Sequence, residues 1–389
     1  MSVARGVGLI AASVFVAILL MEVGLRIMGY SRPVFYRYDE VLGANLRPGV
    51  AGYYKKEDLI YIRLNDDGMR GPDRPYVKPA STVRVAVMGD SFTEGFQVGY
   101  EDLFTTVLER ALAKCPAGDA GIEVLNFGVS GFGTAREILK YQEHARRYDP
   151  DLVLLMFYPG NDYRNNHPGL ESNPLLPYFV MNVDKPVLDA SFRSSGVFKK
   201  KLRYSNARNT IVNWSRALQL VNEVLVAWKT GSLFARAADP EVRPEPVPIP
   251  YIEPVEPIWK EAQRATDAML VLLAEHVKSE GRKFVLANVV AAEASPDHQT
   301  RKAWADAQRG RGFAGEEERF RRLAQSSGFE FVGLIEPVLR HIDRTGDDLF
   351  YFDYLGRSGG HWNKIGHRVV GMALADRICP FLHADAASS

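Results

Sequence analysis

The stretch Val83-Arg84-Val85-Ala86-Val87-Met88-Gly89-Asp90-Ser91-Phe92 contains the clearest indication of the fold. A β-branched run that ends in a tight Gly-Asp-Ser turn predicts a strand, and the apolar spacing from Leu103 to Leu112 predicts a helix after it. Ser91 then lies at the carboxyl end of a strand, where open α/β sheets form their ligand crevice. Backbone N–H groups at a helix start favour a developing anion. Ser91 is therefore a candidate nucleophile, and a plain turn capped by serine is the alternative.

Two later segments also place glycine or polar residues directly after a short apolar run. Residues 124–134 read as a strand that enters a glycine-rich turn, where the Gly131 N–H is a candidate donor to an oxyanion. Residues 152–158 form a continuous apolar run, as expected for a strand covered on both faces. This strand leads into Pro159-Gly160-Asn161-Asp162, where the Asn161 amide is a candidate third donor.

A histidine near the C-terminus completes the candidate site. The segment Gly359-Gly360-His361-Trp362-Asn363-Lys364-Ile365-Gly366-His367 precedes an amphipathic pattern that predicts a helix. His361 therefore lies in the loop before that helix, where a general base can face Ser91.

The order of these four blocks resembles that of the SGNH hydrolase superfamily, also called GDSL esterases, over roughly residues 80 to 380. The resemblance implies that Ser91 is the nucleophile and His361 the base. It also implies that the N–H groups of Ser91 and Gly131 form an oxyanion hole with Asn161. The expected activity is that of a membrane-anchored serine esterase, a carboxylic-ester hydrolase or deacetylase that uses no cofactor. An O-acetyltransferase acting on cell-surface polysaccharide is the enzymatic alternative.

The chain departs from the family pattern just before His361. Members usually carry an acidic residue two or three positions earlier, and this chain has glycine and serine there. The nearest upstream carboxylate is Asp353, with Asp347 and Asp348 further back. Either the loop brings Asp353 round, or a backbone carbonyl orients the imidazole, or the site is catalytically poor. The last interpretation would make the chain a catalytically weak, membrane-tethered binding protein.

Composition excludes several other classes of function. The 389 residues contain 48 Lys and Arg against 47 Asp and Glu, a net charge of +1 that gives no electrostatic case for nucleic acid. The eight histidines and two cysteines show no metal-ligand spacing, so no metal is expected. The expected partner is a small-molecule ester or acylated glycan substrate. Cys115 and Cys379 either pair or remain separate buried thiols.

The N-terminus carries an apolar stretch that predicts a membrane anchor. Residues 7–28 are long enough to span a bilayer as one helix, within which Glu22 and Arg26 are spaced to pair. A cleaved signal peptide and a buried helix are the alternatives, and no small-residue cleavage site follows the apolar run. Arginines flank both ends, so their count does not favour export, but large domains translocate largely regardless of it. We expect the catalytic domain to be extracytoplasmic, in the periplasm.

The rest of the chain predicts one α/β domain with an arm and an insertion. Residues 31–80 form an N-terminal arm, and residues 81–383 form a flavodoxin-like, three-layer α/β/α domain with a parallel five-stranded sheet. The insertion, residues 163–256, has a helical pattern over 209–237 and a proline-rich return over 240–257. It is either a cap over the site or a packing excursion.

Overall fold

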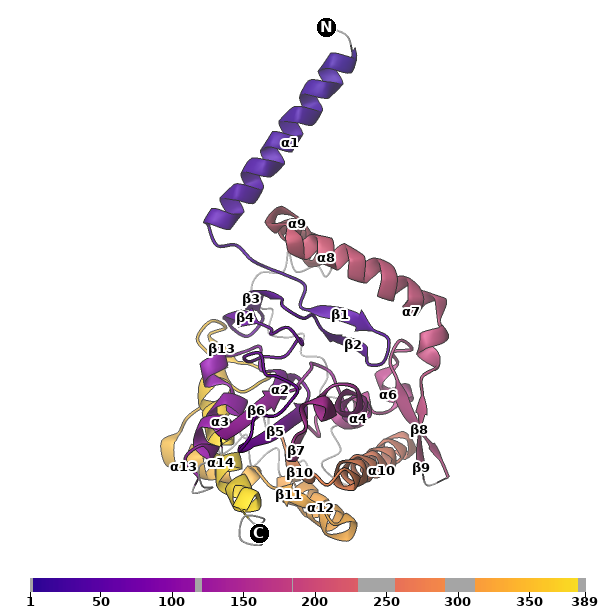
Figure 1. The fold of residues 1–389 in the computed structure, drawn as a ribbon, viewed down its shortest axis with the longest axis vertical. Helices are drawn as coiled ribbons and strands as arrows, with labels where there is room; N and C mark the ends of the chain where they lie inside the picture. The colour runs from indigo at the N-terminus through magenta and orange to yellow at the C-terminus, as the bar shows by residue number, and fades with distance from the viewer. Residues whose placement is uncertain (1–2, 116–120, 184, 230–255, 291–311, 384–389) are drawn as a thin grey trace.

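The computed structural model describes residues 3–115, 121–183, 185–229, 256–290 and 312–383. Its body is built around one sheet, and a long N-terminal helix, α1 (Val3–Ile27), projects from that body (Figure 1). Most of the proline-rich segment, residues 240–255, lies outside the described residues.

The central sheet has five strands in the order β11-β10-β7-β5-β6, and every neighbouring pair is parallel. In chain order this is the 2-1-3-4-5 arrangement of flavodoxin-like folds. The predicted fold class is therefore confirmed. The strands are β5 (Thr82–Gly89), β6 (Gly121–Asn126), β7 (Leu152–Phe157), β10 (Lys283–Asn288) and β11 (Glu330–Val332).

Helices cover both faces of this sheet, as the alternation of apolar residues along β5 requires. Val85 and Val87 belong to one buried cluster, and Ala86 and Met88 belong to the other. The Val85 face is covered by α3 (Phe104–Leu112), α13 (Ile335–Thr345) and α14 (Lys364–His383). The Ala86 face is covered by α4 (Thr134–Glu143), α10 (Pro257–Ser279) and α12 (Gly312–Ser327).

The N-terminal arm is part of the core. Its two antiparallel hairpins pair β1 (Tyr36–Asp39) with β2 (Gly43–Leu46) and β3 (Ala51–Lys55) with β4 (Leu59–Arg63). Arm residues including Phe35, Leu46 and Ile62 are buried in the same cluster as the α4 and α10 side chains. This packing fixes the position of the arm on the sheet domain.

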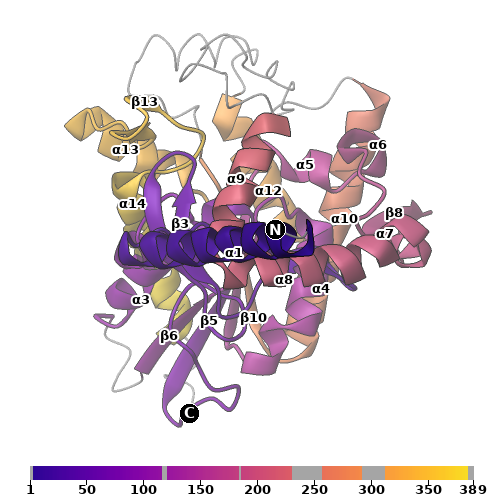
Figure 2. The ribbon, with the colours of Figure 1, turned by 90° about the horizontal axis from the view of Figure 1, so that it is seen from above.

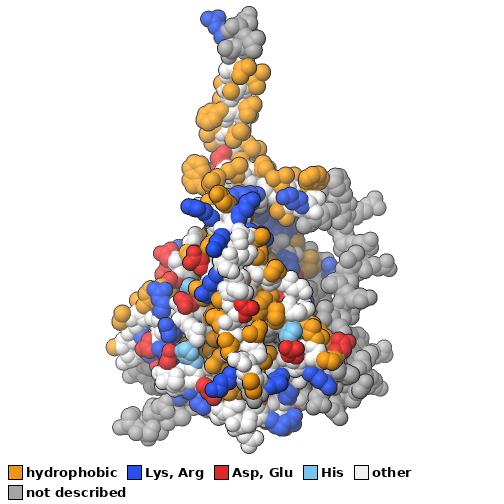
Figure 3. Space-filling model, turned by 90° about the vertical axis from the view of Figure 1, so that its right-hand side faces the viewer, with side chains coloured by type: hydrophobic (Ala, Val, Ile, Leu, Met, Phe, Trp, Pro, Cys, Tyr) orange, Lys and Arg blue, Asp and Glu red, His pale blue; other side chains and the backbone are white. Residues whose placement is uncertain are grey.

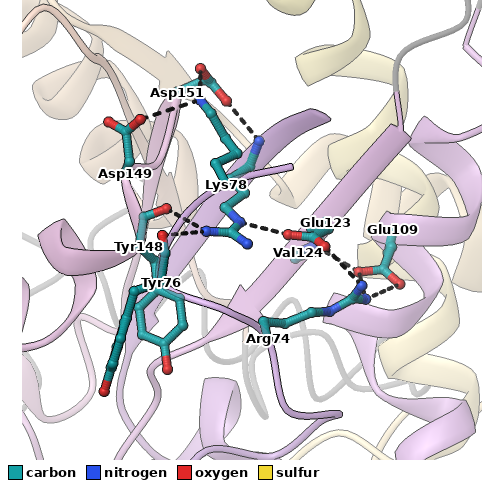
Figure 4. Close-up of polar contacts among 10 residues, drawn as sticks. Arg74, Tyr76, Lys78, Glu109, Glu123, Val124, Tyr148, Asp149 and Asp151 are labelled. Carbon is teal, nitrogen blue, oxygen red and sulfur yellow. Dashed lines mark hydrogen bonds and ion pairs between the residues drawn. The ribbon is translucent and has the colours of Figure 1, made fainter. Parts of the chain in front are cut away.

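A polar network fastens the end of the arm to the sheet (Figure 4). The Arg84 side chain in β5 is fully buried, and its Nε donates to Glu123 Oε2 at 2.5 Å. Arg74 reaches the other oxygen of Glu123 at 3.0 Å, and Lys78 pairs with Asp151 at 2.6 Å. Because a buried charge is costly without a partner, this network holds the segment before β5 in one place.

The described part of the insertion packs on the arm and on α1. Its hairpin of β8 (Tyr178–Asn182) and β9 (Lys185–Asp189) contacts α10. It continues through α7 (Gly196–Lys200), a π-helical turn (Lys201–Ser205), α8 (Asn206–Trp214) and α9 (Arg216–Lys229). Helix α8 contacts β1 and α9 contacts α1. Helix is thus present over the described part of 209–237, whereas the cap remains a prediction because residues 230–255 are outside the description.

Helix α1 has the properties of a candidate membrane span over Arg5–Ile27: an 18-residue stretch of it has mean hydropathy 2.3 and no residue buried in the body. Leu25, near the end of the helix, is buried. A signal sequence would share these properties. Arg26 and Glu22 form the expected ion pair at 2.7 Å. Figure 2 shows α1 from above, at the side of the body that carries α8 and α9.

One disulfide joins two helices that are distant in the sequence. Cys115 after α3 and Cys379 in α14 form a disulfide, with their Cα atoms 6.1 Å apart. The short elements are α2 (Ser91–Glu94), α5 (Asp162–Asn165), α6 (Pro168–Glu171), β12 (Tyr351–Phe352) and β13 (Arg357–Ser358), with 3-10 turns at Tyr100–Asp102, Ala145–Tyr148 and Ser191–Ser194.

Candidate active site

Ser91 follows the carboxyl end of β5, an inner strand that lies between β7 and the edge strand β6. Gly89 ends the strand with φ +155°, and a Cβ at this position would lie 2.2 Å from Thr93 Oγ1, so only glycine fits. Asp90 caps the next turn by accepting the Phe92 N–H at 2.9 Å. The helix that Ser91 begins is only the four-residue α2, and the expected longer helix starts at Phe104. The dipole of this short helix therefore stabilises a negative charge near Ser91 less than the longer helix expected from the sequence would.

His361 faces Ser91 as the sequence pattern predicts. Its Nε2 lies 2.8 Å from Ser91 Oγ, which is hydrogen-bond distance. The neighbouring residue Trp362 is fully buried and donates its indole N–H to the Val290 carbonyl at 2.6 Å. Asn363 anchors the same loop by donating to two backbone carbonyls. The loop is therefore held firmly enough to define the position of the imidazole.

The carboxylate at the other ring nitrogen is Glu57, which the sequence analysis did not identify. His361 Nδ1 lies 2.6 Å from Glu57 Oε1, and the same oxygen accepts the Gly360 N–H at 3.0 Å. Glu57 is buried in the turn between β3 and β4. The arm therefore carries a charged side chain directly to the His361 loop.

None of the three aspartates considered from the sequence orients His361. Asp353 is exposed, in the turn between β12 and β13. Asp347 pairs with His341 at 2.8 Å, and Asp348 accepts from Phe350 N and Ser358 Oγ. The missing acid has a steric explanation, because a Cβ at Gly359 would lie only 2.9 Å from Glu57 Cγ. In the sequence, the Gly359-Gly360 pair was the one indication that the acid comes from another segment, because two residues without side chains leave room beside His361.

The surroundings of Glu57 favour its ionised form. Burial raises the pKa of this carboxyl, but the hydrogen bond and charge of His361, the nearby Lys56 charge and the Gly360 N–H outweigh it, and the pKa is lowered from 4.5. A carboxylate at this position can accept the Nδ1–H of His361 and leave Nε2 free to accept the Ser91 proton.

Hydrogen bonds hold Asn161 to the Gly-Asp-Ser turn, and the turn that contains Gly131 to α2. Asn161 Nδ2 donates one hydrogen to Asp90 Oδ2 at 2.8 Å, so its second hydrogen can serve a ligand. The turn before Gly131 is held because the Ser130 N–H donates to Glu94 Oε1 in α2 at 3.0 Å. Gly131 itself has φ +72° and open space where a side chain would lie.

Asp90, in the Gly-Asp-Ser turn, interacts electrostatically with two further buried carboxyl groups, Glu137 and Asp162. Burial raises the pKa of Asp90, which hydrogen bonds from Phe92 and Asn161 partly oppose. Burial also raises the pKa of Glu137 and Asp162, and their mutual repulsion with Asp90 adds to the effect. Among the described residues, no group of three His, Cys, Asp or Glu side chains could hold a metal ion.

A cavity of about 370 Å³ lies beside the His361 loop. Asp58, Asp353 and Lys364 are among its lining residues, whereas Ser91 and His361 are not. A larger cavity of about 810 Å³ lies between α3 and α14, at the Cys115–Cys379 disulfide. The site geometry does not depend on either cavity.

Comparison with known proteins gives one family match and several remote structural likenesses. The model of the GDSL-like Lipase/Acylhydrolase family matches residues 87–369, most of the chain. None of the curated proteins compared with the chain matches it.

Among solved structures, the chain is similar to LAE5, an alpha/beta hydrolase enzyme from the metagenome of Lake Arreo, with 14% identity, 79% of this chain and 99% of that chain covered, and a TM-score of 0.39. A putative GDSL-like lipase from Parabacteroides merdae shows 11% identity, 79% and 100% coverage, and a TM-score of 0.40. Axe2, an acetylxylan esterase from Geobacillus stearothermophilus, shows 14% identity, with 76% of this chain and 94% of that chain covered, and a TM-score of 0.37. At these values the likenesses indicate no substrate for this chain.

Proposed function

The chain belongs to the GDSL-like lipase/acylhydrolase family and is a hydrolase of ester bonds, and we propose that it is a membrane-anchored serine esterase that acts through Ser91, His361 and Glu57. One observation carries the assignment of residues. Ser91 Oγ, the two His361 ring nitrogens and Glu57 Oε1 follow one another at 2.8 and 2.6 Å. This is the connectivity of a nucleophile, a base and an orienting acid.

In the proposed reaction, Ser91 Oγ attacks the acyl carbon of the ester while His361 Nε2 takes the hydroxyl proton. Glu57 keeps Nδ1 protonated and stabilises the imidazolium that forms. The N–H groups of Ser91 and Gly131 and the Asn161 amide hold the tetrahedral oxyanion. His361 then returns the proton to the leaving alcohol, and water releases the acyl group by the reverse sequence.

The presence of Glu57 removes the main reason to regard the chain as a binding protein. That alternative depended on a missing acid, and an ionised carboxylate contacts His361 Nδ1. The proposed substrate is a small-molecule ester or an acylated glycan, and the open space beside Gly131 leaves room for it there.

Two observations support the proposed location. Helix α1 is long enough to cross a bilayer, and it contains an 18-residue apolar stretch of which no residue is buried in the body. The Cys115–Cys379 disulfide is typical of domains that fold in an oxidising compartment. We therefore place the catalytic domain outside the cytoplasm, in the periplasm.

The test is hydrolysis of p-nitrophenyl acetate by the full-length chain in detergent, together with labelling by a fluorophosphonate probe. Ser91→Ala is expected to lose both labelling and turnover, whereas Ser194→Ala, at an exposed serine in the insertion, keeps both. Equal labelling of Ser91→Ala and the parent would refute the nucleophile assignment. Product analysis with a sugar acceptor tests the hydrolase, because acetylated sugar in place of free acetate would indicate an acyltransferase.

A further inference from the structure

Helix α9 and Trp214, the last residue of α8, carry an exposed apolar stripe. Leu218, Val221, Leu225 and Trp228 are spaced by three, four and three residues, so they lie along one side of α9. Trp214 lies just before α9, separated from it by Ser215. Trp214 is 81% exposed and Trp228 is 63% exposed. Large apolar side chains gathered in this way on a surface indicate a binding face.

The opposite side of α9 is fixed to the body. Gln219 is buried, and its Oε1 accepts the Arg32 N–H of the arm at 2.7 Å. Gln219 Nε2 also donates to the Asn213 carbonyl at 2.9 Å. The stripe therefore cannot turn inward without breaking these contacts.

Hydrogen bonds also join the start of α9 to the end of α1. Glu22 Oε2 accepts from Ser215 Oγ at 2.8 Å and from the Ala217 N–H at 2.9 Å. Arg26 Nη2 donates to the Trp214 carbonyl at 3.0 Å. In Figures 1 and 2, α9 lies beside the end of α1 that enters the body. The apolar stripe is thus continuous with the candidate span at the level where the span would leave the bilayer.

The charges around the stripe suit a lipid surface. Arg26 lies beside Trp214, Lys229 follows Trp228, and Arg208 donates to Asn222 on α9 at 2.7 Å. Figure 3 shows hydrophobic side chains gathered where α1 meets the body, with Lys and Arg side chains close to them. Tryptophan with flanking basic residues is the composition of helices at the membrane interface.

We propose that α9 lies in the membrane surface, with the stripe at the headgroup level, as a second membrane contact beside α1. The inference rests on the proposed anchoring by α1. The occupant of this face is the lipid interface, because the face is continuous with the span and carries interfacial side chains. Contact along α9 would set the orientation of the catalytic body relative to the bilayer, which a single spanning helix leaves free to vary.

The experiment uses the full-length chain in lipid vesicles that contain phosphatidylcholine brominated near the headgroup end of the acyl chains. Bromine quenches tryptophan fluorescence on contact, so quenching of the parent is expected. The double variant Trp214→Phe/Trp228→Phe is expected to lose most of that quenching. Trp259→Phe is the matched control, because Trp259 packs against the core; it should retain the quenching.

Flotation of the vesicles separates failure of the inference from failure of the anchor. If the parent floats with the vesicles but is not quenched, the α9 inference is wrong and the anchor stands. If the parent does not float, both are wrong. If neither the brominated lipid nor aqueous acrylamide quenches the two tryptophans, protein covers the stripe. A cross-linked dimer that the double variant loses would then identify a second copy as the occupant, and its absence would point to residues 230–255.

Discussion

Glu57 and His361 are 304 positions apart in the chain, and they meet because the arm folds over the sheet domain. The orienting acid and the base are therefore supplied by two distant segments of the chain, the arm and the loop before α14. This arrangement depends on Gly359, whose missing side chain makes room for the Glu57 stem. An acid two positions before the histidine would occupy the space that Glu57 now fills.

Glu57→Gln should lower kcat for p-nitrophenyl acetate by about 10⁴, as loss of the acid does in the serine-triad template. The amide keeps the side-chain volume but cannot favour the required His361 tautomer. KM should change little, because Glu57 acts on the reaction only through the orientation and tautomer of His361. Asp353→Asn is the control and should retain parental kcat, since Asp353 is exposed and His361 Nδ1 contacts Glu57 instead. Loss of activity in the control alone would contradict the assignment of Glu57.

The lowered pKa of Glu57 also predicts how the pair responds to acid. Since the folded-state pKa lies below the ordinary 4.5, the contribution of Glu57 to stability is fully present above that pH. It is lost as the pH falls through the lowered value. A urea titration at stepwise lower pH should therefore show a smaller loss of stability in Glu57→Gln than in the parent over this acid range.

Asn161→Ala should lower kcat by about 10² to 10³, the usual cost of removing one oxyanion-hole donor. Asn161 donates one hydrogen to Asp90, so its second hydrogen is held in a defined direction. Steady-state hydrolysis measures the effect. Asn165→Ala, in the short helix α5 that follows Asn161, is the control and should keep kcat because its amide donates to Glu171. If both variants have parental kcat, Asn161 is not a donor in the reaction.

At the scale of elements, helix α8 acts as a neighbour for the free edge of the arm strand β1. Asn206 accepts the Tyr38 N–H at 2.9 Å and donates to the Tyr38 carbonyl at 2.8 Å. This side chain pairs with the strand as another backbone would. Arg47 adds a hydrogen bond to the Asn206 carbonyl at 3.2 Å. The insertion thereby holds the arm that delivers Glu57.

Asn206→Ala should reduce the free energy of unfolding by about 2 kcal/mol, because it leaves the two backbone groups of Tyr38 without this partner. Denaturant unfolding of the full-length chain in detergent measures the change. Asn209→Ala is the control on the same helix, where the side chain accepts only an exposed bond from the adjacent Arg208 in the described structure. An equal loss in both variants would show that α8 does not hold β1 through Asn206.

At the scale of the whole molecule, the buried His367 couples stability to pH. It lies in α14, and its Nδ1 accepts the Phe104 N–H at the start of α3 at 3.2 Å. Burial lowers the pKa of His367 to about 3, and the nearby charges of Arg70 and His361 act in the same direction. The unfolded chain takes up a proton near the ordinary value of 6.5, but the folded chain does not. Stability must therefore decrease as the pH falls from 6.5 towards 3.

His367→Gln should flatten this pH dependence by up to about 1.4 kcal/mol per pH unit, which corresponds to one proton. The variant will be less stable overall, so the measured quantity is the slope of the unfolding free energy between pH 6.5 and 4. His144, whose pKa burial lowers to about 4, keeps its own contribution in both proteins. Identical slopes for the variant and the parent would mean that His367 is protonated in the folded state.

The sequence alone determined the parallel sheet and brought Ser91 and His361 together as candidates. Both follow from local patterns, because apolar runs predict strands and parallel strands end at one edge of a sheet. Sequence also singled out Gly131 and Asn161, whose catalytic roles stay predictions. Only the tertiary structure decided that Glu57 is the partner of His361, that Cys115 pairs with Cys379, and that α9 is joined to α1. These contacts bridge long stretches of chain, 304 and 264 positions in the first two cases, where local periodicity carries no information.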